Sequence, residues 1–293
     1  MRQTLPGPEA LSRFCFVGLL VLLCLSLALP VSARVPVRSA ILYNLSSGKV
    51  LYTQNADASI PPASLTKIMT MMLTLDAVRQ RKISLKTWLA VSRKAARTGG
   101  SSMHLKSGER IRLENLLYGM AVVSGNDAAV AAAEKISGNT RLFVRQMNRK
   151  ARALGMKHTQ FKNVNGLPAA GQRTTARDML TLSCAYLRAH PTALRYHSPR
   201  SFRHGRRTMR ATNKLLGVVP GVDGLKTGWT VASGYNLVAT AKRKGVRLVA
   251  VVMGGTSSGR RDLAARRLLE AGFASPDSPR NVERSLSRRS KRR

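Results

Sequence analysis

Ser64 and Lys67 stand three positions apart, directly after Pro61 and Pro62. Two prolines can lead into a helix but cannot lie inside one, so we expect Ser64 near the start of the helix that follows. Residues three apart share a helix face, which brings the Lys67 amine within reach of the Ser64 hydroxyl. Burial and nearby cations can make a lysine give up its proton near neutral pH. The spacing therefore predicts nucleophilic catalysis by Ser64, with Lys67 as general base.

A second polar triplet, 124–126, lies between the apolar segments 116–123 and 128–133. Polar residues between two buried helices favour a place on a cleft, so we predict that Ser124 and Asn126 face the site. Similar patterns recur at 46–49 and 137–139. There we expect only a hairpin turn and the end of a helix.

Lys226, Thr227 and Gly228 precede the turn into the last pair of predicted strands. A strand edge offers backbone groups to an extended peptide, and a glycine lets that backbone approach closely. A lysine ammonium and a threonine hydroxyl suit a carboxylate ligand. We therefore predict that this segment binds the carboxylate of a substrate.

Strands are predicted at both ends of the chain and helices between them. Ser46-Ser47-Gly48 and Arg243-Lys244-Gly245 are typical hairpin connections. The expected strands are 39–45, 49–54, 235–242 and 246–253, and the expected helices are 65–81, 113–123, 128–136 and 140–154. This order predicts an α/β (α+β) domain over 34–274, with one antiparallel sheet completed by both chain ends and an inserted helical block.

The three motifs in this order resemble those of the penicillin-binding proteins and serine β-lactamases. The residues around them are similar to the D-alanyl-D-alanine carboxypeptidases, the low-molecular-mass penicillin-binding proteins of the serine peptidase S11 type. The matching segments are 63–70, 99–103, 124–128, 165–167, 223–230 and 268–273. The resemblance covers nearly all of 36–273 and implies a β-lactamase/transpeptidase-like fold.

The same resemblance implies a reaction and its catalytic residues. Ser64 is expected to attack the carbonyl between the two terminal D-alanines of a peptidoglycan stem peptide, with Lys67 accepting its proton. Ser124 is expected to relay a proton to the leaving D-alanine, and Asn126 to orient Lys67 and the substrate amide. The enzyme would be penicillin-sensitive, with β-lactams as covalent inhibitors.

Substrate-binding roles follow from the resemblance as well. The backbone N–H groups of Ser64 and Trp229 are expected to form an oxyanion hole. Lys226 and Thr227 would hold the terminal carboxylate, with Gly228 between Thr227 and Trp229.

An arginine near the start of the last helix is expected to serve the same carboxylate. Arg261 fits best by its separation in sequence from 268–269, although the adjacent Arg260 is an alternative. Some relatives have a second arginine at the position that corresponds to Thr212. The threonine is a departure from the family pattern, and the nearest arginine in the sequence is Arg210.

Two alternatives share these motifs. A class A β-lactamase needs a carboxylate for deacylation in the loop after the second motif, and 157–172 contains no Asp or Glu. A D,D-endopeptidase that cleaves peptidoglycan crosslinks uses the same residues, so this function remains an alternative.

No cofactor or metal is expected. The five histidines are not paired with acids at ligand spacing, and Cys184 lies in an apolar stretch that indicates packing. The histidines are His104, His158, His190, His197 and His204.

The chain of 293 residues has 50 Lys and Arg against 13 Asp and Glu, a net charge of +37. Residues 1–33 are predicted to be a secretory signal peptide, because 14–29 is apolar and Val31-Ser32-Ala33 suits cleavage. Its loss leaves +36. We expect export to the periplasm or the outer face of the cytoplasmic membrane, and a monomer.

The charge also allows a different class of function, a basic envelope-binding module. The basic residues have no interleaved aromatic residues for base stacking, so a nucleic-acid partner is not expected. Contact with an anionic membrane or envelope polymers would be electrostatic and salt-sensitive.

The segment 275–293 is predicted to be a disordered basic tail. Val282 and Leu286 are its only apolar anchors, which is too few for membrane insertion. We therefore expect a protein with a single catalytic domain.

Overall fold

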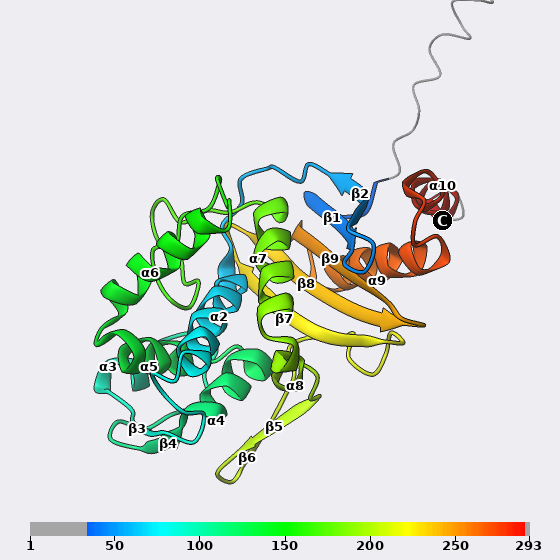
Figure 1. Ribbon diagram of the computed structural model, residues 1–293. Coiled ribbons are helices and arrows are strands. Elements are labelled where there is room, and N and C mark those ends of the chain that lie inside the picture. Colours follow the sequence, from blue (N-terminus) through cyan, green and yellow to red (C-terminus); the bar gives the residue numbers. More distant parts are fainter. Residues whose placement is uncertain (1–33, 291–293) are drawn as a thin grey trace, which may run out of the picture. The chain divides into compact units, whose positions relative to one another are not determined.

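Five strands form the central sheet, in the order β2-β1-β9-β8-β7 (Figure 1). The computed structural model describes residues 34–290, and the predicted signal peptide lies outside the described residues. All four neighbouring pairs are antiparallel. The strands are β1 (Ser39–Asn44), β2 (Lys49–Gln54), β7 (Val222–Thr230), β8 (Gly234–Arg243) and β9 (Val246–Gly255). The predicted sheet, built from both ends of the chain, is confirmed.

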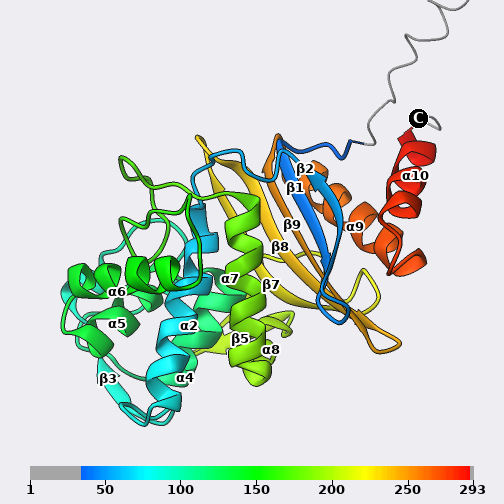
Figure 2. The same ribbon diagram turned by 45° about the horizontal axis from the view of Figure 1, so that its top comes forward.

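Helices cover both faces of this sheet. Helix α9 (Ser258–Ala274) packs on β9 and β8, and α7 (Ala176–Ala189) packs on β9 and β1 from the other side (Figure 2). The middle of β9 is therefore buried on both faces, which explains its nearly continuous apolar sequence. Gly272 lets α9 approach closely, because a Cβ there would lie 2.8 Å from side-chain atoms of both Leu248 and Leu42.

The helical block lies between β2 and β7 in the chain. Helix α2 (Thr66–Arg79) runs through this block and is buried along most of its length. The other elements are η1 (Ala63–Leu65), α3 (Arg93–Ala96), α4 (Leu113–Tyr118), η2 (Gly119–Val123), α5 (Asn126–Ser137), α6 (Thr140–Ala153), η3 (Pro191–Ala193), α8 (Leu194–His197) and the hairpins β3 (Trp88–Ala90) with β4 (Arg110–Arg112) and β5 (Ser201–His204) with β6 (Arg207–Arg210). The helix predicted over 113–123 is α-helical only to Tyr118, because η2 is a wider π-helical turn.

The prediction of a disordered tail is wrong for residues 275–290, and residues 291–293 lie outside the described part of the chain. Helix α10 (Pro279–Ser290) follows α9 and packs against α9 and β2. Val282 and Leu286 lie one turn apart on one face of α10, and both are buried. Two apolar side chains are too few to form a core of their own, but they suffice to attach one helix to a core that already exists. The domain therefore continues beyond 274.

Candidate active site

Ser64 lies in the short 3₁₀ turn η1 that leads into α2. Pro62 precedes the turn, and Ala63 has a positive φ of 46°. Lys67 is in the first turn of α2, and its Nζ lies 2.9 Å from the Ser64 Oγ. The predicted meeting of these two side chains is thus present in the structure, with Ser64 in the turn that begins the helix.

Two further contacts fix the Lys67 amine, whose side chain is fully buried. Its Nζ donates to the Asn126 Oδ1 at 2.6 Å and to the main-chain oxygen of Asn165 at 2.7 Å. Both partners are carbonyl oxygens, which can only accept. A neutral amine that donates its two hydrogens to them keeps its lone pair for the hydroxyl hydrogen of Ser64.

Burial is the main reason why the pKa of Lys67 lies well below its usual value, and the positive charge of Lys226 lowers it further. The buried Asp127 acts in the opposite direction and raises it. Because the first two causes win, the structure favours the neutral amine, which is the form that can accept a proton.

Ser124 ends the π-helical turn η2, in the left-handed region at φ 64°. Its Oγ is buried and has no hydrogen-bond partner among the described residues. A serine rarely adopts this conformation, and a buried hydroxyl without a partner is costly. Both features are typical of a functional site, where a substrate supplies the missing partner.

Asn126 and Asp127 tie this turn to the glycine-containing loop at 99–105. The Asn126 Nδ2 donates to the Gly99 oxygen at 2.7 Å. The Asp127 carboxylate accepts from the backbone N–H groups of Met103 and Leu105 at 3.0 and 3.1 Å. These bonds orient the Asn126 amide, so that its oxygen faces Lys67. This supporting role of Asp127 was not predicted from the sequence.

The 163–167 loop, in which 165–167 matches the family in sequence, completes the site in the structure. Gly166 has φ +86°, and a Cβ there would lie 1.8 Å from the Ala63 oxygen. Only glycine fits this conformation and this close approach. The contact presses the loop against the nucleophile turn and brings the Asn165 oxygen to Lys67.

Strand β7 passes close to the nucleophile. A Cβ on Gly228 would lie 2.9 Å from the Ser64 nitrogen, so a glycine is required at this point. Lys226 is fully buried, and its Nζ donates to the Thr227 oxygen at 2.8 Å. Burial, with the charge of Arg261, lowers the pKa of Lys226 to about 7. The ring of Trp229 is about half exposed.

The two candidate arginines differ in their surroundings. Arg261 is 5% exposed, and its charge reaches Lys226. Its guanidinium also pairs with the neighbouring Asp262, at 2.7 Å. Arg260 is exposed at the start of α9. The structure therefore brings Arg261, and not Arg260, to the group formed by Lys226 and Thr227, which we call the carboxylate site after its predicted ligand.

Thr212 stands where some relatives have an arginine, and it contacts both β7 and the turn η2. The Thr227 hydroxyl donates to the Thr212 Oγ1 at 2.8 Å. The Thr212 backbone N–H donates to the oxygen of Val122, in η2, at 3.0 Å. Thr212 thus connects β7 to the turn that ends at Ser124. Arg210 is exposed on β6.

Two buried contacts hold β7 at the residue before Lys226. His197 is fully enclosed, with its Nδ1 3.0 Å from the Leu225 oxygen and its Nε2 3.0 Å from the Tyr186 hydroxyl. Burial lowers the pKa of His197 to about 3, so the ring is neutral. A neutral ring can donate through Nδ1 and accept through Nε2. No sequence pattern marks His197 for this positioning role.

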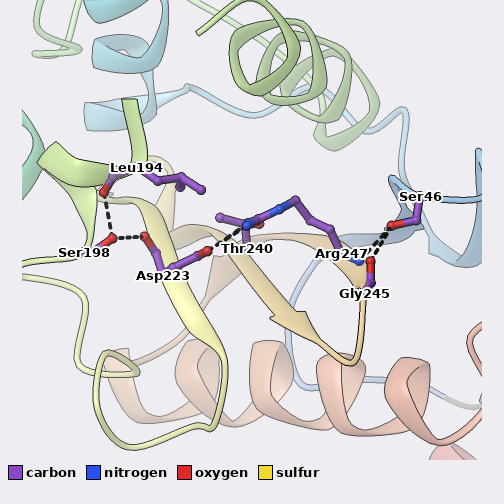
Figure 3. A network of polar contacts seen from close by, with 7 residues as sticks. All are labelled: Ser46, Leu194, Ser198, Asp223, Thr240, Gly245 and Arg247. Atoms are coloured by element: carbon purple, nitrogen blue, oxygen red, sulfur yellow. Dashed lines mark hydrogen bonds and ion pairs between the residues drawn. The ribbon is translucent and has the colours of Figure 1, made fainter. Parts of the chain in front are cut away.

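A polar network anchors the beginning of β7 (Figure 3). Asp223 accepts two hydrogen bonds from the Arg247 guanidinium, at 2.9 and 3.1 Å, and Arg247 also donates to the Thr240 hydroxyl. The Ser198 hydroxyl contacts both the Leu194 and the Asp223 oxygens. These bonds connect α8 with three neighbouring strands and so fix the strand that carries the carboxylate site.

Within 34–290, no group of three or more His, Cys, Asp or Glu residues could hold a metal ion. Cys184 is buried, and burial raises the pKa of its thiol to about 11. The helices of this described part are also too short or too polar to cross a membrane. The two repeated patterns lie where expected, at the β1–β2 turn and at the end of α5.

A model of the D-alanyl-D-alanine carboxypeptidase family matches residues 29–257. The chain is 38% identical over 246 residues to D-alanyl-D-alanine carboxypeptidase DacF of Bacillus subtilis, covering 81% of this chain but only 62% of the relative's length. It is 32% identical over 274 residues to a D-alanyl-D-alanine endopeptidase of Pseudomonas aeruginosa, covering 88% of this chain and 86% of that protein.

Solved structures agree with this relationship. Penicillin binding protein 6B from Escherichia coli superposes with a TM-score of 0.78 at 38% identity, over 82% of this chain and 78% of that one. Penicillin-Binding Protein D2 from Listeria monocytogenes, in its ampicillin-bound form, superposes with a TM-score of 0.75 at 32% identity. The match covers 82% of this chain and 98% of that one. The chain, with its serine–lysine pair between a five-stranded sheet and a helical block, belongs to the D-alanyl-D-alanine carboxypeptidase family.

Proposed function

We propose that this protein is a serine-type D-alanyl-D-alanine carboxypeptidase that removes the terminal D-alanine from peptidoglycan stem peptides. One observation carries the proposal. The Lys67 Nζ lies 2.9 Å from the Ser64 Oγ, while its other two partners are oxygens that can only accept. A buried amine held in this way is suited to take the hydroxyl proton of Ser64.

The reaction divides into two steps. The Ser64 Oγ attacks the carbonyl carbon between the two D-alanines while its proton passes to Lys67, and the C–N bond then breaks. The leaving D-alanine amine takes up a proton, for which the Ser124 hydroxyl is the relay. Water then hydrolyses the acyl ester on Ser64 and restores the free enzyme. The backbone N–H groups of Ser64 and Trp229 are the proposed donors to the oxyanion.

The carboxylate site supplies substrate recognition. Lys226 and Arg261 are cations buried close to each other, and the ion pair with Asp262 balances only one of the two charges. A substrate carboxylate relieves the remaining repulsion, and the Thr227 hydroxyl donates to it after turning away from Thr212. This arrangement favours a peptide with a free carboxyl terminus over an internal peptide bond.

β-Lactams are proposed to acylate Ser64 and to leave slowly. The structure of the Listeria relative is an ampicillin-bound form. The loop that approaches Lys67 offers it the main-chain oxygen of Asn165, and its sequence from 157 to 172 contains no carboxylate to activate a deacylating water. Rapid turnover of a chromogenic cephalosporin would contradict this proposal.

The endopeptidase is the second candidate, and a specific observation favours it. The relative named D-alanyl-D-alanine endopeptidase is covered over 86% of its length, against 62% for the Bacillus carboxypeptidase. Both activities use the same nucleophile and base. They differ in what lies beyond the cleaved bond, because a crosslinked peptide continues past the second D-alanine.

One experiment separates these activities. The purified protein is incubated with a monomeric muropeptide that ends in D-Ala-D-Ala and, separately, with a crosslinked dimer, and the products are identified by mass. Loss of one D-alanine from the monomer supports the carboxypeptidase, and splitting of the dimer supports the endopeptidase. If both substrates stay intact while the protein is folded, both proposals fail. Ser64→Ala is the matched inactive control.

We also propose that the protein is exported and contacts anionic membrane or envelope polymers through its surface charge. Arg280, Arg284 and Arg288 recur every four residues along α10, and all three are exposed; we call them the arginine row. Val282 and Leu286 are buried in the domain, so α10 offers no apolar face for insertion. Binding to anionic vesicles should therefore disappear at high salt.

A further inference from the structure

A cavity of about 440 Å³ lies beside the active site and has no part in the mechanism above. The first two turns of α6, Val130 of α5 and the 162–167 loop line it, and Lys94 and Thr98 complete its wall. Val164 and Leu167 give its floor an apolar character. Its size suits a small part of a peptide rather than a single ion.

The rim of this cavity is strongly positive. Lys94, Arg141, Arg145 and Lys162 line it, all four are exposed, and no acidic residue is among the lining residues. None of the four is in an ion pair with another described residue. Lys94 donates to the Thr140 hydroxyl at 2.8 Å, which leaves its charge uncompensated.

The acid nearest along α5 is already engaged. Glu134 follows Val130 by one helical turn and accepts from the Ser92 hydroxyl at 2.6 Å. None of the ion pairs among the described residues joins Glu134 to a cation of the rim. Four like charges around one hollow repel each other, and an anionic ligand removes that repulsion.

The cavity adjoins the catalytic residues through the 163–167 loop. Asn165 lines it and gives its main-chain oxygen to Lys67 at 2.7 Å. Leu167 also lines it and approaches Gly100, where a Cβ would lie 3.5 Å from Leu167 and 2.7 Å from the Asn126 amide. A ligand in the cavity is therefore separated from the Lys67–Asn126 pair by little more than one layer of residues.

We propose that this cavity is a subsite for a carboxylate-bearing residue of the stem peptide, upstream of the bond that is cleaved. This inference rests on the proposed function, because it names a further part of the same substrate. The carboxylate contacts Arg141, Arg145 and Lys162, and the aliphatic carbons that carry it lie on Val164 and Leu167. The terminal carboxylate occupies the separate site at Lys226. Recognition of two anionic groups, on either side of the scissile bond, selects acidic stems over neutral ones.

The test compares two peptides that end in D-Ala-D-Ala and differ by a single upstream residue, glutamate in one and glutamine in the other. D-Alanine release by the unaltered protein should show a KM about three- to tenfold lower for the glutamate peptide, because exposed ion pairs are individually weak. The double variant Arg141→Gln/Arg145→Gln should lose this preference while its kcat stays unchanged. Acylation by a fluorescent penicillin should stay unchanged as well, which shows that Ser64 and Lys67 remain intact.

The matched control is Arg149→Gln/Arg152→Gln, which removes two exposed arginines from the same helix outside the cavity. It should keep the preference for the glutamate peptide. A preference that survives in Arg141→Gln/Arg145→Gln, or that falls equally in the control, overturns the subsite.

A binding measurement separates this inference from the proposed activity. Titration of the Ser64→Ala protein with both peptides reports affinity without catalysis. Tighter binding of the glutamate peptide, lost in the same double variant, supports the subsite whatever the unaltered protein cleaves. Equal binding of both peptides overturns it. Absence of D-alanine release from either peptide by the unaltered protein overturns the proposed function.

Discussion

The site and the surface of this protein use the same chemical group in opposite ways. Lys67, Lys226 and Arg261 are buried close to one another, whereas the arginine row of α10 faces water. In the site, burial and mutual repulsion lower the pKa of both lysines. Water screens the charges of the arginine row, which therefore act only as a diffuse positive field. Environment, and not the number of cations, thus determines which of them do chemistry.

The largest effect is expected at Lys67, among the buried cations. Lys67→Arg keeps a long basic side chain but replaces an amine of lowered pKa with a group that stays protonated. Because the general base is lost, the rate of acylation by a fluorescent penicillin should fall about 10²- to 10⁴-fold. Lys82→Arg, at an exposed lysine just beyond α2, is the matched control and should acylate normally. Acylation by Lys67→Arg at an undiminished rate would exclude Lys67 as the base.

The second largest effect is a dependence of D-alanine release on pH. Above about pH 7 the free Lys226 loses its proton, so the carboxylate site loses a cation and binds an anionic substrate less well. The value of kcat/KM should therefore fall up to tenfold per pH unit above about 7, to the level that Arg261 and Thr227 sustain alone. The pH–rate profile of D-alanine release measures this fall.

Arg261→Gln tests whether Lys226 is the group responsible. It removes one of the two causes that lower the pKa of Lys226, so the alkaline fall should move to higher pH. Arg260→Gln, the exposed neighbour, should leave the fall in place. If both variants keep the fall at the same pH, it belongs to another group.

A smaller effect is expected at Thr212, which is partly buried and contacts the carboxylate site without a charge. Thr212→Val removes the acceptor that competes with the substrate for the Thr227 hydroxyl hydrogen, a contact worth about 1 kcal/mol, so the KM for D-alanine release should fall about fivefold with kcat little changed. Thr212→Ser should restore it. Thr208→Val, at an exposed threonine of β6, is the control. Equal KM values for Thr212→Val and the unaltered protein would show that this hydroxyl pair has no role in binding.

The smallest effect on catalysis is expected from the arginine row of α10. Replacement of all three members of the arginine row by glutamine should leave D-alanine release within about twofold, because exposed charges act weakly over a distance. The same variant should sediment less with anionic vesicles at low salt. A large loss of activity in solution would mean that surface and site are not separate, and unchanged sedimentation would remove the row from the proposed membrane contact.

The elements that the sequence predicted best have strong local patterns. Both hairpins, the antiparallel sheet and α2 follow from runs of apolar residues and from turn residues such as Gly48 and Gly245. The C-terminal helix was missed for the opposite reason. Val282 and Leu286 carry little pattern of their own, and their burial depends on a surface that α9 and β2 provide.

The residues of the site also differ in how well the sequence predicts them. The contact between Lys67 and Ser64 can be predicted from their spacing of three residues, because such residues lie on one side of a helical turn. The Asn165 oxygen belongs to the backbone, so no residue type announces it. His197 and Thr212 act on β7 from distant parts of the chain, and an ordinary histidine or threonine carries no sign of this in the sequence.

Residue types and their spacing were sufficient to determine the order of the three motifs, the charge of the chain and the resemblance to the family. The tertiary structure was needed to establish which of the many cations are buried together, which arginine faces Lys226 and where the two hydrogens of Lys67 go. Those outcomes depend on burial and on distances of about 3 Å between residues far apart in the chain. Local sequence does not encode such distances, because they are set by the packing of the whole domain.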